Sequence, residues 1–146
     1  MTIKSSAIRA AALVGLLGLV PIGCGKADSP ATDGESPAAV TSITGSEVKR
    51  VTLTLDAEER IGLTLTPVTT KTELSSVPYG ALLYDPSGKT WIFVQVANHA
   101  FERRSVDVSS IVGDVVSLRS GPRPGTLVVS VGATELYGAE IGVGDE

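Results

Sequence analysis

The side chains that could carry out chemistry are few and widely spaced along the chain. The sequence contains one histidine, His99, and one cysteine, Cys24. A zinc site needs several histidine, cysteine or carboxylate ligands at workable spacing, and His99 has no second histidine to accompany it. The only methionine is Met1, so a thioether site for a soft metal is excluded as well. We therefore expect no metal site and no cofactor.

The acids and hydroxyl groups also lack a catalytic arrangement. Glu58 and Glu59 are adjacent in a short predicted helix and point in different directions, whereas catalysis by two carboxylates needs apposed side chains. No G-x-S-x-G turn accompanies the many serines, and one turn histidine does not complete a triad. Among the later acids, Glu135 is a candidate for one half of a buried ion pair. We expect a protein that is not an enzyme.

The clearest candidates for contact with a partner are three consecutive residues, Glu102, Arg103 and Arg104. Successive residues of a strand point to opposite faces of a sheet, so only one of the two arginines can face a given partner. The simplest interpretation is a solvated strand whose charges pair with acids on a neighbouring strand. The functional alternative is a contact at the rim of an interface with an acidic partner, because arginine is enriched in interfaces. Trp91 and Phe93 are expected in the core.

The first residues have the composition of an export signal. Lys4 and Arg9 precede an uncharged apolar run over residues 10–20. This run is shorter than the ~20 apolar residues that a membrane-spanning helix needs. A basic start, a short apolar run and small residues at its end are typical of a signal peptide, which we place at residues 1–23.

The only cysteine, Cys24, stands where this segment ends and has a glycine on each side. This arrangement resembles the lipobox of bacterial lipoproteins, although Pro21 stands where the motif usually has leucine. The resemblance implies cleavage before Cys24 and attachment of fatty acyl chains, such as palmitate, to that residue. The alternatives are an ordinary secreted protein and an uncleaved N-terminal anchor. All three place the chain in the cell envelope, facing the periplasm or the exterior.

Charge and composition separate a tether from a folded domain. The chain has a net charge of −4, and loss of Lys4 and Arg9 with the signal peptide would make it −6. Nucleic acid is excluded as a partner, because binding it requires a clustered basic face. Residues 24–47 are rich in small residues and proline with scattered acids, and cannot bury enough apolar surface to offset their ordering entropy. We expect a flexible tether there, anchored by the lipid.

The remaining residues, 48–146, have the pattern of a single all-β domain. Short runs that alternate apolar and polar residues are separated by Gly- and Pro-containing turns, the clearest at residues 85–88. One short helix is predicted at residues 56–61, because Asp56 and Glu59 have the spacing of a capping box. We predict a small barrel, β-roll or sandwich of about six to eight short strands.

Three segments of this domain have a distinctive order of strands and turns: VPYGALLYDPSGKTWIFVQV at residues 77–96, FERRSVDV at 101–108 and GDVVSLRSGPRPGTLVVSVGATELYGAE at 113–140. In this order they resemble the C-terminal region of periplasmic adaptor subunits, the HlyD-type membrane fusion proteins of RND efflux systems. The resemblance covers about residues 77–143, and residues 48–70 resemble the first membrane-proximal strand and helix of the family. The long helical hairpin and the lipoyl-like halves of a full adaptor are missing, since only a short segment separates Val68 from Val77.

The resemblance implies a membrane-proximal domain, with part of the adjoining β-barrel, that docks on a transporter. We therefore expect an envelope lipoprotein that acts as a non-enzymatic, truncated adaptor-like module on an RND-type transporter or a full-length adaptor. Adaptors assemble as rings, so a homo-oligomer is compatible with the resemblance. One alternative is a small envelope β protein that binds an apolar ligand in a concave pocket. Another is a degenerate gene product with no assembled role.

Overall fold

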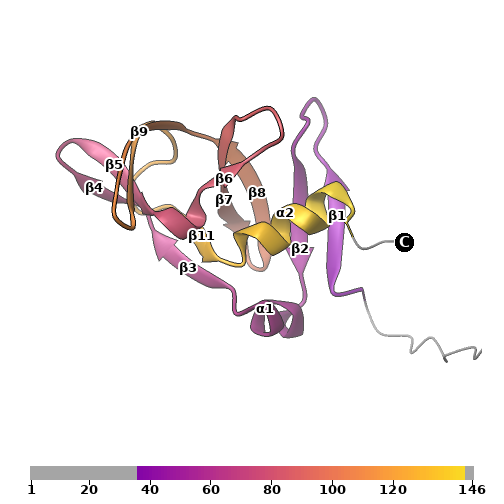
Figure 1. The fold of residues 1–146 in the computed structure, drawn as a ribbon. Helices are drawn as coiled ribbons and strands as arrows, with labels where there is room; N and C mark the ends of the chain where they lie inside the picture. The colour runs from indigo at the N-terminus through magenta and orange to yellow at the C-terminus, as the bar shows by residue number, and fades with distance from the viewer. Residues whose placement is uncertain (1–35, 144–146) are drawn as a thin grey trace, which may run out of the picture. The chain divides into compact units, whose positions relative to one another are not determined.

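Eleven strands, two α-helices and one 3-10 helix form from residues 36–143, the part of the chain that the computed structural model describes (Figure 1). The larger sheet contains β1 (Ala38–Ser42), β2 (Lys49–Leu53), β3 (Thr64–Pro67), β6 (Leu83–Tyr84), β7 (Thr90–Ala97), β8 (Ala100–Ser105) and β11 (Leu127–Val131). The smaller sheet contains β4 (Thr69–Lys71), β5 (Leu74–Pro78), β9 (Asp107–Val112) and β10 (Val115–Ser120). The helices are α1 (Leu55–Ile61), η1 (Tyr79–Ala81) and α2 (Ala133–Ile141). The prediction of an all-β domain with a helix near residues 56–61 is confirmed.

The strands pair antiparallel within two separate sheets. The larger sheet has the order β1-β2-β8-β7-β11-β3, with β6 beside β7, and the smaller has the order β4-β5-β10-β9. Neither sheet closes on itself, so the predicted barrel does not form. The strands are more numerous than predicted, because β4 and β6 are only three and two residues long and because one expected strand divides in two.

Two buried valines carry the chain from one sheet to the other. Val68 lies between β3 and β4, and Val106 lies between β8 and β9; both belong to the same core cluster. Such switches make the corners between two packed sheets. The alternating pattern predicts one strand over residues 101–108, but the chain turns at Val106, whose N–H donates to the carbonyl of Thr90 at 3.0 Å.

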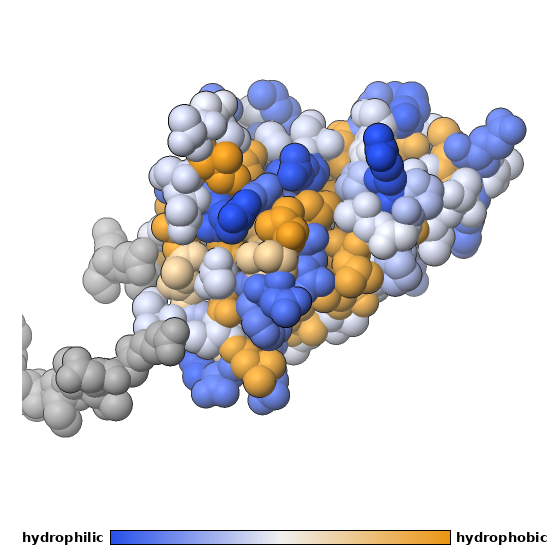
Figure 2. Space-filling model, turned by 180° about the vertical axis from the view of Figure 1, so that it is seen from behind, coloured by the Kyte–Doolittle hydropathy of each residue, from blue (hydrophilic) through white to orange (hydrophobic). Residues whose placement is uncertain are grey.

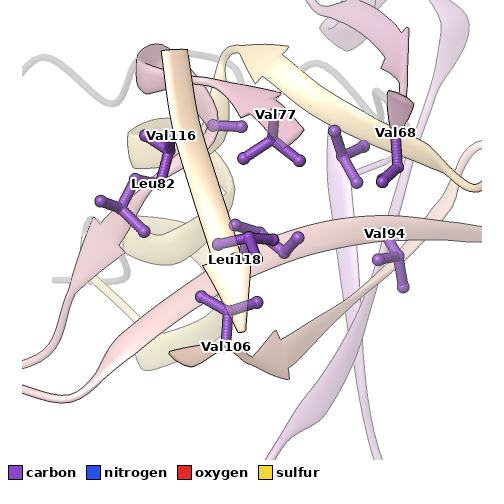
Figure 3. Packing of buried hydrophobic residues seen from close by; sticks show 10 residues of the cluster. Val68, Val77, Leu82, Val94, Val106, Val116 and Leu118 are labelled. Carbon is purple, nitrogen blue, oxygen red and sulfur yellow. The ribbon is translucent and has the colours of Figure 1, made fainter. Parts of the chain in front are cut away.

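The larger sheet buries apolar side chains on both of its faces. Between the two sheets, side chains from both point toward one another, as Figure 3 shows. The members of this cluster are Val68, Val77, Ala81, Leu82, Ile92, Val94, Val106, Val116, Leu118 and Val128. On the other face, α2 crosses in front of the sheet (Figure 1) and covers a second cluster. It consists of Val51, Leu53, Ala57, Phe93, Phe101, Val129, Ala133 and Leu136, so the prediction that Phe93 lies in the core is confirmed.

The first helix has the predicted position but a different cap. Thr54 is the N-cap, and its Oγ1 accepts a hydrogen bond from the Ala57 N–H at 3.2 Å. The predicted cap, Asp56, lies inside the first turn, where its negative charge is still favourable near the positive end of the helix dipole. Gly62 ends the helix in the left-handed conformation, with φ of 63°, which glycine adopts without strain.

The second helix, α2, is not predicted by the sequence pattern. Its buried residues are Ala133, Leu136 and Glu140, so one of the three inward positions carries an acid and the apolar stripe is short. Gly138 in the middle of the helix lowers its intrinsic propensity further. The helix forms because tertiary contacts with the sheet offset its weak local preference.

The structure corrects the boundary between tether and domain. Residues 38–42, assigned to the tether, form β1, which pairs with β2 over five residue pairs. Most β1 side chains are exposed, so backbone pairing holds this strand and an apolar pattern could not reveal it. The predicted signal peptide (1–23), Cys24 and the tether up to residue 35 lie outside the described residues. Within residues 36–143, no helix is long and apolar enough to span a membrane.

The predicted turn after β6 forms and is organised by one carboxylate. The Gly88 N–H donates to the Asp85 carbonyl at 2.9 Å, which closes the turn. The side chain of Asp85 accepts hydrogen bonds from the hydroxyl and N–H of Ser87, the N–H of Lys89 and the indole N–H of Trp91. These bonds, with that of the Ser87 hydroxyl first, lower the pKa of Asp85 from 3.8 to about 2. The ionised carboxylate therefore stabilises the hairpin.

The stability of the fold should depend on Asp85 in a defined range of pH. Since the pKa is lower in the folded state, the contribution of Asp85 is fully present above its unfolded pKa of about 4 and is lost as the pH falls towards about 2. Asp85→Asn should therefore have a lower urea midpoint than the wild type at pH 6, and the difference should shrink between pH 4 and pH 2. A difference that stays constant over this range would contradict the assignment.

Candidate functional site

Strand β8 sends its three charged side chains to opposite faces of the larger sheet. Arg103 points to the face covered by α2, where it contacts Glu140. Glu102 and Arg104 point to the other face, where both contact each other and Glu102 contacts Arg50 of β2. The prediction that the two arginines face opposite sides is confirmed. We refer to the side that carries Arg50, Glu102 and Arg104 as the open face.

Arg103 fastens the C-terminal helix to the sheet. Its Nε lies 2.5 Å from Oε2 of Glu140, and the two side chains are 11% and 2% exposed. Its guanidinium lies 4.6 Å from the ring centre of Trp91 and 5.0 Å from that of Tyr137, within the range of cation–π attraction. The other oxygen of Glu140 accepts the N–H of Lys49 at 3.0 Å. The Arg103–Glu140 contact lacks the direction of a hydrogen bond, so charge attraction holds it.

This arrangement bears on two predictions. Arg103 is nearly buried against Glu140, so of the two arginines predicted to contact a partner Arg104 is the one whose side chain is exposed. Glu135 is exposed, and the buried half of the ion pair is Glu140. The reason is the phase of α2, which turns position 140 toward the sheet and position 135 away from it. The sequence gives no helical pattern from which that phase could be read.

Glu102 is the acid that organises the open face. Its Oε1 accepts hydrogen bonds from Nε and Nη2 of Arg50 at 2.9 and 2.6 Å, and its Oε2 accepts one from Nη2 of Arg104 at 3.1 Å. Arg50 and Glu102 are directly opposite one another on β2 and β8. The Glu102 side chain is 9% exposed, whereas those of Arg50 and Arg104 are 48% and 57% exposed. One nearly buried carboxylate thus orients two guanidinium groups toward solvent.

Arg50 is the functional candidate that the sequence pattern misses. The sequence predicts that charges of residues 102–104 pair with acids on a neighbouring strand. On the open face the pairing across strands does occur, but the acid is Glu102 of β8 and the base is Arg50 of β2. The signal that could identify Arg50 is its place in an alternating strand, but the register between β2 and β8 is needed to bring it to Glu102.

An open groove of about 720 Å³ begins beside Arg104. It forms where β7 separates from β11, since the two strands share one residue pair, Val94 with Val128. The turn after β10 makes the opposite wall and contributes Arg123. The groove, which we call the basic groove, is lined by Val94, Gln95, Val96, Arg104, Ser105, Ser120, Gly121, Pro122, Arg123 and Thr126. All its charged residues are arginines, although the whole chain has a net charge of −4.

The side of the domain opposite α2 is mixed in character. Figure 2 shows strongly hydrophilic groups next to apolar ones there.

A second, smaller pocket of about 220 Å³ lies between the helices and β1 and is mainly apolar. Its lining residues are Pro37, Ala38, Leu53, Ala57, Arg60, Ile61, Glu135, Leu136 and Ala139. The charged, open groove and this apolar pocket are therefore concavities of different character.

The other side chains that could take part in chemistry do not form a further site among the described residues. His99, in the turn between β7 and β8, has its Nδ1 3.0 Å from Oε2 of Glu58, which links that turn to α1. Within residues 36–143, no group of three or more histidine, cysteine or acidic side chains is arranged to hold a metal ion. The position of Cys24 lies outside these residues.

The fold and these concavities define a small two-sheet β domain with a basic groove and a separate apolar pocket. Comparison with protein-family models, with curated proteins and with solved structures finds no match for the chain. The likeness to efflux adaptors rests on the sequence segments alone, and the geometry of the open face is the independent observation from which a function can be argued.

Proposed function

We propose that the chain is a lipid-anchored envelope protein that acts as a non-enzymatic interaction module. It docks through its open face on an RND-type transporter, or on a full-length adaptor of such a transporter. Lipid on Cys24 would hold the domain at the membrane and raise its effective concentration near a membrane partner without adding contacts. The residues before β1 would then serve as the tether.

The observation that carries this proposal is the geometry around Glu102. Two half-exposed guanidinium groups are oriented by a nearly buried carboxylate, so less side-chain entropy is lost when a partner binds them. A guanidinium presents donors in a planar fork that matches a carboxylate. The open face thus favours an acidic partner surface. The segments that resemble efflux adaptors independently imply a docking role.

Reversing the charge of Arg104 tests the docking. Arg104→Glu leaves the Arg50–Glu102 pair in place and puts a like charge against an acidic partner, so recovery of the transporter from detergent-solubilised membranes should fall about tenfold. Arg119→Glu is the matched control, because Arg119 is 58% exposed and pairs across strands with Asp107. Equal losses in both variants, or no transporter recovered with the wild type, would contradict the proposal.

The lipid anchor has a direct test of its own. Mass spectrometry of the mature N-terminus should find acyl chains on Cys24, and Cys24→Ser should move the protein from the membrane fraction to the soluble one. An N-terminus that begins elsewhere, or an unmodified Cys24, would remove the anchor from the proposal and leave the docking surface to be judged separately.

The apolar pocket supports a second candidate function, the binding of a small apolar ligand. Its walls come from α1, α2 and β1, with Arg60 and Glu135 at its polar positions, which fits a mainly apolar site with a few polar groups. Gentle native mass spectrometry of the purified full chain would show a lipophilic molecule released together with the protein. If the purified protein carries no ligand and still recovers the transporter, docking is favoured over ligand binding.

A further inference from the structure

We infer that the basic groove binds an extended, acidic segment of the partner protein. The inference rests on the proposed docking function and names the chemistry that this docking recognises. It joins Arg104 of the open face to another anchoring arginine, Arg123, from a different part of the chain.

The groove has walls from two independent parts of the domain. On one side, β7 and β8 contribute Val94, Val96 and Arg104, and a register shift between Gln95 and Ala97 interrupts their regular pairing. On the other side, residues 120–126 form a turn held by the core. The N–H of Val68 donates to the Thr126 carbonyl and the N–H of Gly125 donates to the Val68 carbonyl, each at 2.8 Å. Both walls are therefore positioned before any ligand arrives.

The charged groups of the groove retain capacity for a carboxylate. Arg104 uses Nη2 for its contact with Glu102, and that acid is shared with Arg50. None of the ion pairs among residues 36–143 involves Arg123. A guanidinium has five N–H donors, so each arginine can bind a carboxylate with two parallel hydrogen bonds. Hydroxyl groups of the lining, from Ser105, Ser120 and Thr126, can orient the same ligand.

The form of the groove favours a polypeptide over a compact small molecule. Small-molecule sites bury about 70–90% of their ligand, whereas this groove is open along its side. Its lining combines arginines with Val94, Val96 and Pro122. An extended peptide presents successive side chains to opposite sides, so a sequence that alternates acidic and apolar residues could offer carboxylates to Arg104 and Arg123 and apolar groups to the valines.

A peptide-binding experiment tests this chemistry without the transporter. The probe is a short fluorescein-labelled peptide that alternates glutamate and valine, and its anisotropy is measured with the full-length chain in nanodiscs of zwitterionic lipid. Binding should be saturable, should weaken as salt is raised, and should be absent for the same peptide with glutamine in place of glutamate. Arg123→Glu and Arg104→Glu should each weaken it at least about tenfold. The control Arg119→Glu should leave it unchanged.

The outcomes separate this inference from the proposed function. The inference is overturned if the peptide does not bind, if Arg119→Glu weakens binding as much as Arg123→Glu, or if the probe only promotes self-association detected by light scattering. If the transporter is still recovered in an Arg104-dependent manner, docking stands and only the acidic segment is rejected. If peptide binding depends on Arg123 while no transporter is recovered, the groove is supported and its assignment to a transporter fails. Thermal unfolding of each variant confirms that the fold is unchanged.

Discussion

Arg103→Ala should lower the free energy of unfolding by about 3–5 kcal/mol, because it leaves the carboxylate of Glu140 buried without its cationic partner. The Glu140 side chain is 2% exposed, so water cannot replace the lost charge unless α2 moves away from the sheet. The substitution also removes the cation–π contacts of the guanidinium with the rings of Trp91 and Tyr137. Urea unfolding followed by circular dichroism measures the loss.

A double substitution separates the buried charge from the packing. Arg103→Met with Glu140→Gln removes both charges, keeps similar volumes and retains an acceptor for the Lys49 N–H. This variant should recover most of the stability lost in Arg103→Ala, because replacing a buried ion pair by neutral groups of similar size costs far less than removing one partner. If the double variant is as unstable as the single one, the charge is not the cause, and the loss belongs to packing against the aromatic rings.

The adjacent residues Arg103 and Arg104 of β8 therefore have different roles, which urea unfolding and partner recovery can distinguish. Arg103→Ala should reduce stability and disturb α2, while Arg104→Glu should lower the unfolding midpoint much less, since Arg50 still pairs with Glu102, and should reduce partner recovery. This contrast follows from exposures of 11% and 57% for the two side chains. A strand with one face against a helix and the other toward solvent can fasten the fold and present a surface with consecutive residues.

The elements that could be predicted are those specified by local sequence. Alternation of apolar residues identifies β2, and a run that is apolar on both faces identifies β7. The Asp-Pro-Ser-Gly turn identifies the hairpin before β7. Gly62 ends α1, as its position after a short helical run indicates. These signals act over a few residues, so neither the partner strands nor the opposite face of a sheet is needed to read them.

The parts that could not be predicted depend on contacts between distant residues. Arg50 and Glu102 are 52 positions apart, and only the register of β2 against β8 brings them together. Glu140 is buried because Arg103 neutralises it, so an acid occupies a position where a helix pattern expects an apolar residue. β1 is held by backbone pairing with β2, and its small side chains resemble those of a tether. In each case tertiary structure overrides a weak or contrary local signal.

Phe93→Ala is the second substitution with a large expected effect. Phe93 is fully buried on the α2 side of β7, in the cluster that contains Leu136, and it is the cross-strand neighbour of Arg103. Removing its ring should lower the free energy of unfolding by about 3–5 kcal/mol, since the loss of apolar burial adds to the cost of a cavity. The urea midpoint should fall with little change in the slope, as expected when stability changes without a change in exposed surface.

Two comparisons make the result for Phe93 specific to the packing beneath α2. Tyr84→Ala removes an aromatic ring that is 53% exposed on β6, and should change the free energy of unfolding by less than about 0.5 kcal/mol. Combining Phe93→Ala with Arg103→Ala should cost less than the two single losses together, because both substitutions loosen the same helix and the second finds it already displaced. Fully additive losses would show that the ring and the ion pair hold the helix independently.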